Sequence, residues 1–286
     1  MEPVTEGRRE DQSDLDLRST RELVELMNDE DATVAAAVRD TAAPLAAAID
    51  AVVERLERGG RLVYVGAGTS GRLAAMDAAE CEPTFGLRPG VVIAIAVTEE
   101  AAEDDSGAGA ADLAAAKVGP GDVVVAVSAS GVTPYVLGAA RAAADVGALT
   151  VGVVCAPDSE LGHAVEHEIV AVVGPEVISG STRLKAGTAQ KLILNTISTV
   201  TMVRLGKTFG NLMIDVVADN AKLRSRARRA VELATGASSD EAEAALEAAR
   251  GDAKVAIVSL LTGITAEEAR MRLKSAGGNV RRSLAP

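Results

Sequence analysis

The segment Arg61-Leu-Val-Tyr-Val-Gly-Ala-Gly-Thr-Ser-Gly-Arg72 decides the fold class of this chain. Its apolar residues, Leu62 to Val65, are β-prone and predict a strand buried within a sheet. Three glycines then predict a turn that needs backbone freedom, and the residues 73–79 have a helical composition. A strand, a glycine turn and a helix start together offer free backbone N–H groups and a helix dipole to an anion.

The pattern around this segment alternates apolar strands with Ala-rich helices, which predicts an α/β fold. Several strands are near-continuous apolar runs, as a sheet covered on both faces requires. We therefore expect a doubly wound, parallel, five-stranded sheet. The predicted strands are 61–65, 91–97, 122–127, 149–154 and 168–173.

Helical segments flank the predicted sheet on both sides of the sequence. Ser19 to Glu22 resembles an N-cap, Asn28 to Asp31 predicts a break, and 33–58 predicts one long helix that Pro44 kinks. After the sheet we expect a helical stretch at 212–234 and a small helical set at 239–250, 252–262 and 265–275, with one more turn at 280–284. The predicted divisions are 1–58 for the N-terminal loop and helices, 59–222 for the sheet domain and 223–286 for a small C-terminal helical domain.

Composition narrows the classes of partner. The net charge of −12 argues against nucleic acid or an anionic membrane surface, so an anionic substrate must be held by local groups. Two cysteines, Cys81 and Cys155, make no disulfide framework and favour a reducing compartment. No signal peptide or apolar run of membrane-spanning length is evident, so we expect a cytoplasmic protein.

A second hydroxyl-rich loop follows the predicted strand at 122–127. In Ser128-Ala-Ser130-Gly-Val-Thr133-Pro, three hydroxyls and the N–H groups of the turn can saturate one phosphate monoester. Alternatively, the two serines only satisfy the turn and Thr133 caps the next helix. Two such loops at the carboxyl ends of parallel strands lie where open sheets bind ligands. This second loop therefore argues against a dinucleotide site, although residues 66–71 formally match the dinucleotide fingerprint.

Acidic residues near these loops are candidates for acid–base chemistry. Glu80 lies at the end of the helix predicted after the first loop, with Pro83 stopping that helix. The cluster 99–105 follows the second strand. Two carboxylates facing one sugar phosphate can divide the work of a general base and a general acid. Equally, Glu80 can be an ordinary helix-end residue and the cluster a solvated loop.

A third turn, Ser179-Gly-Ser181-Thr-Arg183-Leu-Lys185, carries two cations ahead of a helix and can supply positive charge to the site. Either cation can instead pair with local acids. His163 and His167 have a spacing of four residues but no third ligand, so we expect no metal site and no other cofactor.

Five motifs of the chain resemble the N-acetylmuramic acid 6-phosphate etherases, a family within the sugar isomerase domain proteins. Two further segments, 5–7 and 28–31, fit as well, so the resemblance spans nearly the whole chain. The long motif at 179–191 is also found in the related glucokinase regulatory protein, which binds phosphosugars without turning them over. The motifs are Val65–Arg72, Asp77–Thr84, Ser130–Tyr135, Ser179–Lys191 and Phe209–Val216.

The resemblance implies a cytoplasmic, metal-free homodimer that cleaves the D-lactyl ether of N-acetylmuramic acid 6-phosphate to N-acetylglucosamine 6-phosphate and D-lactate. It assigns catalysis to Glu80 and Glu103. Between the second strand and Glu103 this chain is shorter than the family, so Glu99 or Glu100 is an alternative to Glu103. The substrate-binding residues expected from the loops are Gly68, Thr69, Ser70, Ser128, Ser130, Thr133, Ser181 and Lys185.

Elimination explains why such an enzyme needs two proton-transfer groups. Opening the sugar ring exposes the C1 aldehyde and acidifies the C2 proton; a base removes that proton, and lactate leaves C3 with help from an acid. Glu80 is then the acid, which should lie in a poorly solvated place so that it is protonated near neutral pH. Glu103 is the base. An aldose–ketose isomerase and a non-catalytic phosphosugar regulator are the rival functions.

Overall fold

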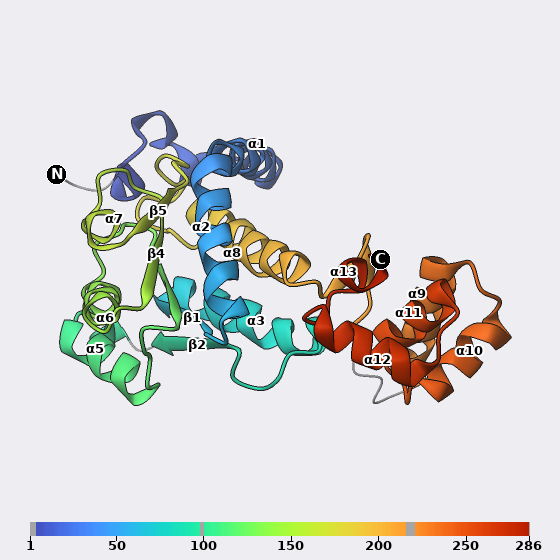
Figure 1. Ribbon diagram of the computed structural model, residues 1–286. Helices are drawn as coiled ribbons and strands as arrows, with labels where there is room; N and C mark the ends of the chain where they lie inside the picture. The colour runs from blue at the N-terminus through green and yellow to red at the C-terminus, as the bar shows by residue number, and fades with distance from the viewer. Residues whose placement is uncertain (1–3, 98–99, 216–220, 286) are drawn as a thin grey trace. The chain divides into compact units, whose positions relative to one another are not determined.

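The computed structural model describes residues 4–97, 100–215 and 221–285, with the side chains at 100–101 and 221–223 also left out (Figure 1). Its centre is a parallel five-stranded sheet in the order β2-β1-β3-β4-β5, which confirms the predicted fold class. Most strand bounds agree with the prediction within a residue, but the last strand ends three residues early. The strands are β1 Leu62–Ala67, β2 Val92–Val97, β3 Val123–Val127, β4 Leu149–Val154 and β5 His167–Val170.

Helices cover both faces of the sheet (Figure 1). Every residue of β1, β3 and β4 is buried, as expected from their continuous apolar sequence. Figure 1 shows α5 and α6 on one side, and α2 with the first parts of α3 and α8 on the other. These helices are α2 Ala42–Glu57, α3 Gly68–Phe85, α5 Ser106–Ala115, α6 Pro134–Asp145 and α8 Lys185–Arg204.

The α5 and α6 helices approach each other closely because glycine stands at their crossing. An added Cβ at Gly109 would lie 2.0 Å from the Tyr135 carbonyl oxygen, and one at Gly138 would lie 1.9 Å from the carbonyl oxygen of Ser106. The buried Tyr135 also donates its hydroxyl to Asp112 at 2.7 Å. Burial, followed by this bond to a carboxylate, raises the pKa of the Tyr135 hydroxyl.

The N-terminal helices differ from the prediction. A capping box between Ser19 and Glu22 starts α1 (Thr20–Asp40), as expected, but Asn28 to Asp31 do not break it. The break falls at Thr41, where α1 and α2 bend by 59°. Pro44 lies in the first turn of α2, where its missing N–H has no helical partner to lose, so it starts a helix instead of kinking one.

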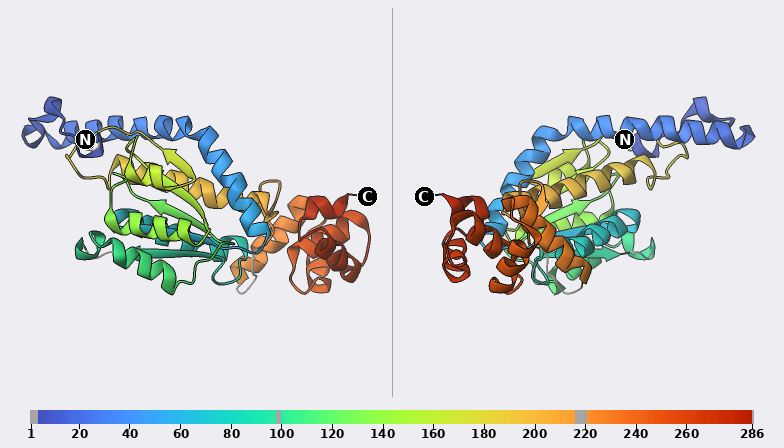
Figure 2. Two further views of the ribbon diagram at one scale, coloured as in Figure 1. Left: turned by 60° about the vertical axis from the view of Figure 1, so that its left-hand side comes forward. Right: turned by 90° about the vertical axis from the view of Figure 1, so that its right-hand side faces the viewer.

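Figure 2 shows α1 extending past the sheet, with the short 3-10 turns of the chain start beside its first residues. These turns are Val4–Glu6, Glu10–Gln12 and Leu15–Leu17. Thr5 is fully buried there. The N-terminal segment therefore forms short helical turns and buries Thr5, although its charged sequence predicted a loop.

The first loop is tighter than predicted. β1 continues to Ala67 and α3 starts at Gly68, so the turn of several residues expected between them is absent. Pro83 does not stop α3, which continues through Pro83 to Phe85. An interior proline removes one helical hydrogen bond, and here it stands in the last turn, where that loss has the least effect.

The chain divides into two compact units, 1–79 with 90–198 and 80–89 with 199–286. The second unit begins earlier than the helical domain expected at 223. It contains a short hairpin of β6 (Thr208–Phe209) and β7 (Leu212–Met213), so the prediction of helix from 212 is wrong. The remaining helices, α9 Ala221–Thr235, α10 Ser239–Ala248, α11 Ala253–Thr262, α12 Ala266–Ser275 and α13 Val280–Leu284, confirm the predicted helical set.

In the part of the chain that the structure describes, no single helix has both the length and the apolarity to cross a membrane; α1 and α2 pass this test only as a bent pair. Both cysteines are buried, and neither forms a disulfide. Burial, and then the nearby charge of Glu176, raise the pKa of the Cys155 thiol to about 12.

An ion pair joins the amino ends of β1 and β3, at the opposite end of these strands from the glycine loop. The Arg61 guanidinium lies 2.7 Å from the carboxylate of Asp122, which also accepts the backbone N–H groups of Arg61 and Gly119. Burial raises the pKa of Asp122, but the hydrogen bonds from Arg61 and Gly119 prevail and hold it below its usual value.

We predict that Asp122→Asn lowers the free energy of unfolding by about 1.5–3 kcal/mol at pH 7, because hydrogen bonds to a charged group are lost. The folded-state pKa of Asp122 lies below its unfolded value of about 3.9. Its contribution is therefore complete above about pH 5 and is lost as the pH falls through the folded pKa. Urea unfolding from pH 3 to 7 measures the difference between the variants. Asp145→Asn, at an exposed position of α6, is the matched control.

Candidate functional site

The strand order places a topological switch point between β1 and β3. The chain leaves β1 toward β2 on one side and β3 toward β4 on the other, because the order is β2-β1-β3-β4-β5. In sheets of this kind, ligands bind outside the carboxyl ends of the strands at such a point. The two predicted hydroxyl-rich loops follow β1 and β3, so the switch point lies between them.

Close packing, not turn formation, explains two of the three glycines at the end of β1 and the start of α3. An added Cβ at Gly66 would lie 2.8 Å from the Gly71 nitrogen, and one at Gly71 would lie 2.7 Å from the Gly66 oxygen. Both have ordinary negative φ angles; only Gly68, at +53°, uses the backbone freedom of glycine. The first turn of α3 thus lies directly on the end of β1.

Glu103 reaches this same turn from the neighbouring strand. It ends the short helix α4 (Glu100–Glu103) after β2. A Cβ added to Gly68 would lie 2.6 Å from the Glu103 Oε1 atom, so the carboxylate lies against Gly68. The structure therefore brings together Glu103 and the glycine loop. Of the two alternatives, Glu99 and the Glu100 side chain lie outside the described residues.

The loop after β3 has its hydroxyls turned toward one another. The Ser128 hydroxyl and the Thr133 hydroxyl lie 2.9 Å apart, and Ser128 also accepts the N–H of Gly131 at 3.1 Å. Ser130 accepts the N–H of Val132 at 3.4 Å. Thr133 precedes α6 but its side chain does not cap that helix. The two serines therefore satisfy the turn, while the first N–H groups of α6 keep no side-chain cap.

Gly131 allows this loop to lie close to the next strand connection. Its φ of +71° suits glycine, and an added Cβ would lie 2.4 Å from the Ser159 Cβ. Its carbonyl oxygen accepts the Leu161 N–H at 2.9 Å. The loop is thus held from both sides, which fixes where its hydroxyls stand.

The third loop is fixed by a buried carboxylate that sequence reasoning missed. Glu176, 1% exposed, accepts the backbone N–H groups of Lys185 and Ala186 at 3.0 and 2.9 Å, and so caps the start of α8. Glu176 therefore occupies the backbone N–H groups at the start of α8 that could otherwise bind an external anion. The only sequence signal for it is an acid nine residues before a helix start.

Lys185 is paired within the chain. The residue is 5% exposed, and its ammonium donates to the Glu30 carboxylate at 2.6 Å. Arg9 contacts the same carboxylate. Burial opposes the ionisation of Glu30, but the hydrogen bonds from Lys185 and Arg9 prevail and lower the pKa of its carboxyl. The sequence left this pairing open as the alternative to substrate binding. A substrate-binding role for Lys185, as for Ser181, stays a prediction.

Thr69 and Ser70 stand in the first turn of α3. Arg72 donates to the Thr69 hydroxyl at 3.3 Å and is exposed. Ser70 is 9% exposed and donates to the amide oxygen of Gln190 on α8 at 2.9 Å. Thr69 is half-buried, and a Cβ added to Gly187 of α8 would lie 3.6 Å from its methyl group; the Ser70 hydroxyl also faces α8.

Glu80 is exposed in the single chain, which contradicts the expectation that it lies in a poorly solvated place. The reason is that α3 continues past it, so its side chain leaves a helix surface and not a helix end. Its neighbour Asp77 is buried instead, accepting the hydroxyls of Tyr64 and Ser198. Glu80 and Glu103 belong to different compact units, and their joint action stays a prediction.

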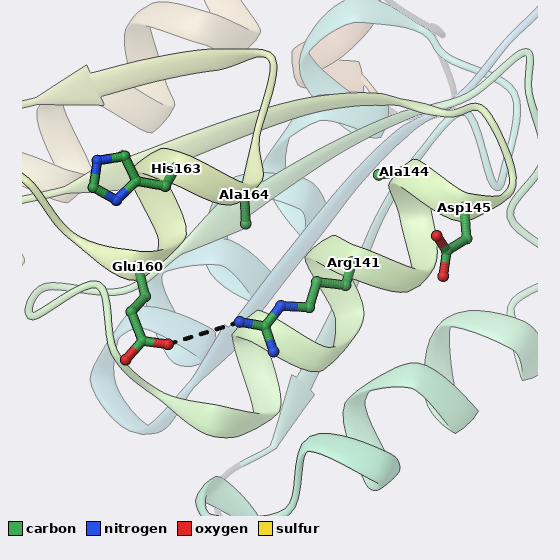
Figure 3. Close-up of a pocket in the computed structure, with 6 residues that line it drawn as sticks. All are labelled: Arg141, Ala144, Asp145, Glu160, His163 and Ala164. Atoms are coloured by element: carbon green, nitrogen blue, oxygen red, sulfur yellow. Dashed lines mark ion pairs between the residues drawn. The ribbon is translucent and has the colours of Figure 1, made fainter.

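The two histidines lie apart from this region. His163 lines a hollow of about 390 Å³ beside α6 and α7 (Glu160–Ala164). Arg141 and Glu160, which also line it, form an ion pair (Figure 3). The His163 imidazole lies 3.1 Å from Asp158. Within the described ranges no group of three or more His, Cys, Asp or Glu side chains is arranged to hold a metal ion.

Comparison with known proteins finds a domain family and closely similar relatives for this chain. The model of the SIS domain matches residues 27–155. An N-acetylmuramic acid 6-phosphate etherase of Rubrobacter xylanophilus is 60% identical over 91% of this chain and 89% of that protein. One from Streptomyces coelicolor is 54% identical over 90% and 85%. A phosphoheptose isomerase structure from Neisseria gonorrhoeae shares the fold alone, with a TM-score of 0.51 and 19% identity over 64% of this chain and 98% of that one.

We predict that Gly68→Ala destabilises the protein by roughly the 1–2 kcal/mol that a left-handed backbone costs alanine, because the atom that its methyl group would meet, Glu103 Oε1, ends a flexible side chain that can turn aside. Gly90→Ala is the matched control: its φ is +85° and its Cβ would meet nothing within 4 Å. Urea unfolding gives both values. Similar losses at the two positions are expected; a clearly larger loss at Gly68 that disappears in a Glu103→Ala background would mean that the Glu103 carboxylate is held rigidly against this glycine.

Proposed function

Because the chain belongs to the N-acetylmuramic acid 6-phosphate etherase family, we propose that it cleaves the D-lactyl ether of N-acetylmuramic acid 6-phosphate to N-acetylglucosamine 6-phosphate and D-lactate. One structural observation carries this proposal: the Glu103 carboxylate lies against Gly68 at the switch point of the sheet, beside two hydroxyl-rich loops. The site then combines a proton-transfer group with an anion-binding turn.

The 6-phosphate is assigned to the loop after β3. Ser128, Ser130 and Thr133 gather there, and the first N–H groups of α6 carry no side-chain cap. A helix N-terminus with free N–H groups favours an anion. In a chain of net charge −12, such local groups attract the phosphate without a global positive field.

The carbon–oxygen bond is broken by elimination. With the ring open, the C1 aldehyde acidifies the C2 proton, which Glu103 removes. Lactate then leaves C3 and takes a proton from Glu80, and water adds back to the unsaturated aldehyde. This sequence needs a base, an acid and a phosphate anchor. The assignment of Glu103 is supported by its place against Gly68; that of Glu80 is supported by the family motif in which it stands.

A homodimer is part of the proposal. A general acid must hold its proton near neutral pH, which burial favours and exposure does not. Glu80 is exposed in the single chain, so a second copy of the chain is proposed to cover it. A cytoplasmic location and a role in peptidoglycan recycling follow from the substrate.

The rival functions are less well supported. An aldose–ketose isomerase needs one base and no second acid, and a phosphosugar regulator needs neither. The relatives at 54–60% identity over nine-tenths of the chain are etherases by name, and the isomerase fold match is too distant in sequence to argue for function.

We predict that Ser130→Ala weakens binding of N-acetylglucosamine 6-phosphate by roughly 1–3 kcal/mol, as expected for a lost hydrogen bond to a charged group. Calorimetry measures the affinity. Unphosphorylated N-acetylglucosamine is the control ligand, because its weaker binding should barely change. Equal losses for both sugars would exclude the assignment of the phosphate to this loop.

We predict that Glu103→Gln stops both C2 proton exchange and lactate release, whereas Glu80→Gln stops lactate release alone. The loss of a general acid or base costs on the order of 10²–10⁴ in rate, so either effect is large. Exchange is measured by NMR in deuterated water and lactate by a coupled assay. Full exchange in Glu103→Gln together with its loss in Glu100→Gln would move the base to Glu100.

The same two variants test the homodimer. If Glu80 of one copy completes the site of the other, mixing the inactive Glu80→Gln and Glu103→Gln proteins after subunit exchange restores part of the lactate release. Each protein mixed with itself is the control. No recovery despite mixed dimers in native mass spectrometry would mean that both glutamates act within one chain.

A further inference from the structure

The N-terminal strap, which we define as residues 4–17, lies on the third turn at 179–185. The Ser179 hydroxyl donates to the Glu6 carbonyl oxygen at 3.2 Å. A Cβ added to Gly180 would lie 3.1 Å from the Glu6 Oε2 atom, so the Glu6 carboxylate lies beside the turn. The strap and the third turn are therefore in contact although they are far apart in the sequence.

A charged contact forms a second link between the strap and the turn. Arg9 contacts the carboxylate of Glu30 on α1, and the Lys185 ammonium donates to the same carboxylate at 2.6 Å. The Lys185 side chain is 6% exposed and that of Glu30 14%, so water and salt screen this contact only weakly. Arg9 thus reaches the end of the third turn through one shared carboxylate.

Apart from these links, little holds the strap in place. Its three 3-10 turns have three residues each, and Thr5 is the one buried residue among them. The Thr5 hydroxyl is buried without a hydrogen-bond partner in the described part of the chain, which opposes closure of the strap. A segment with so few buried contacts is expected to open locally while the rest of the unit stays folded.

A hollow of about 590 Å³ remains between the strap, α1 and the residues that lead into the third turn. The strap contributes Leu15 to its lining, α1 contributes Leu23 and Met27, and Ile178 comes from the third segment. Figure 2 shows the strap beside the first residues of α1. The strap therefore spans a space that its own side chains do not fill, which makes opening less costly.

The third turn leads to the switch point, where the substrate is proposed to bind. Just after the turn, Gly187 donates its N–H to the Thr182 carbonyl oxygen at 2.9 Å, and a Cβ added to Gly187 would lie 3.6 Å from Thr69 Cγ2 in the first loop. A ligand that fixes the turn also fixes the surface on which the strap rests. Because linkage is reciprocal, closure of the strap then strengthens binding of the ligand.

We propose that the strap is a clamp on the third turn that the bound phosphosugar closes, and that Arg9 is the positioning residue that holds the strap shut through Glu30. This inference rests on the proposed function for the identity of the phosphosugar and for its place at the switch point. It gives the N-terminal segment a part in binding that requires no contact between the strap and the substrate.

Two variants move the strap in opposite directions. Arg9→Gln removes the charge that contacts Glu30, while Lys185 keeps its carboxylate. Thr5→Val replaces the unpartnered hydroxyl by a methyl group of similar size and removes the cost of burying it. Arg8→Gln, at the exposed neighbouring position, is the matched control for the loss of a positive charge.

Hydrogen–deuterium exchange of the peptide that contains residues 4–17 measures opening of the strap, with and without N-acetylglucosamine 6-phosphate. In the protein without substitutions, we expect saturating ligand to slow this exchange about fivefold or more. Without ligand, Arg9→Gln should speed the exchange about tenfold and Thr5→Val should slow it about fivefold. Arg8→Gln should behave like the protein without substitutions.

Calorimetry with the same ligand tests the link to binding. Arg9→Gln should bind about 2- to 10-fold more weakly, because part of the binding free energy then goes into closing the strap. Faster strap exchange in Arg9→Gln at unchanged affinity would overturn the proposal, as would strap exchange that saturating ligand leaves unchanged. Equally accelerated exchange in the peptides of the sheet would assign Arg9 to general stability, and would also overturn it.

Lactate release separates failure of this proposal from failure of the proposed function. A protein that binds the ligand and closes the strap, but releases no lactate from N-acetylmuramic acid 6-phosphate, contradicts the proposed function alone. A protein that releases lactate while its strap exchange does not respond to the ligand contradicts the clamp alone.

Discussion

The contact of the β1 backbone with the first turn of α3 is the constraint on which the candidate site depends. Gly66 and Gly71 meet backbone to backbone, and any side chain at either position would overlap the other. This contact sets the direction in which α3 leaves the sheet. Gly68 follows β1 directly with a left-handed backbone, and Glu103 lies against it. The contact between Gly66 and Gly71 therefore positions both the proposed anion-binding turn and the part of α3 against which the Glu103 carboxylate lies.

Carboxylates, more than cations, organise the surroundings of the site. Glu176 caps α8 from within, and Glu30 joins Lys185 to Arg9. In an acidic chain the few buried cations are thus neutralised locally. A buried ammonium without its carboxylate would be strongly destabilised, since an uncompensated charge in the interior costs several kcal/mol. This is consistent with the proposal that hydroxyls and backbone N–H groups hold the anionic ligand.

The sequence predicted the sheet, its parallel strands and the two loops at the switch point, because apolar runs and glycine-hydroxyl turns are local signals. The exact purpose of Gly66 and Gly71 could not be predicted, since backbone contact between a strand and a helix leaves no periodicity. The helix ends predicted at Pro83 and at 28–31 were wrong for a related reason. Residues that disfavour a helix by themselves are helical here, in α3 and α1, because tertiary packing outweighs local propensity. The partners of Lys185 and Ser70 are more than a hundred residues away and have no local signal.

The Glu30–Lys185 contact has a consequence for how the chain is made. The two residues are 155 positions apart, so the ribosome completes β1 to β5 before the partner of Glu30 emerges. Closing so long a loop costs entropy before any contact repays it. During most of translation α1 therefore lacks its contact with Lys185. The N-terminal segment is expected to be among the last parts of the first unit to acquire its native contacts.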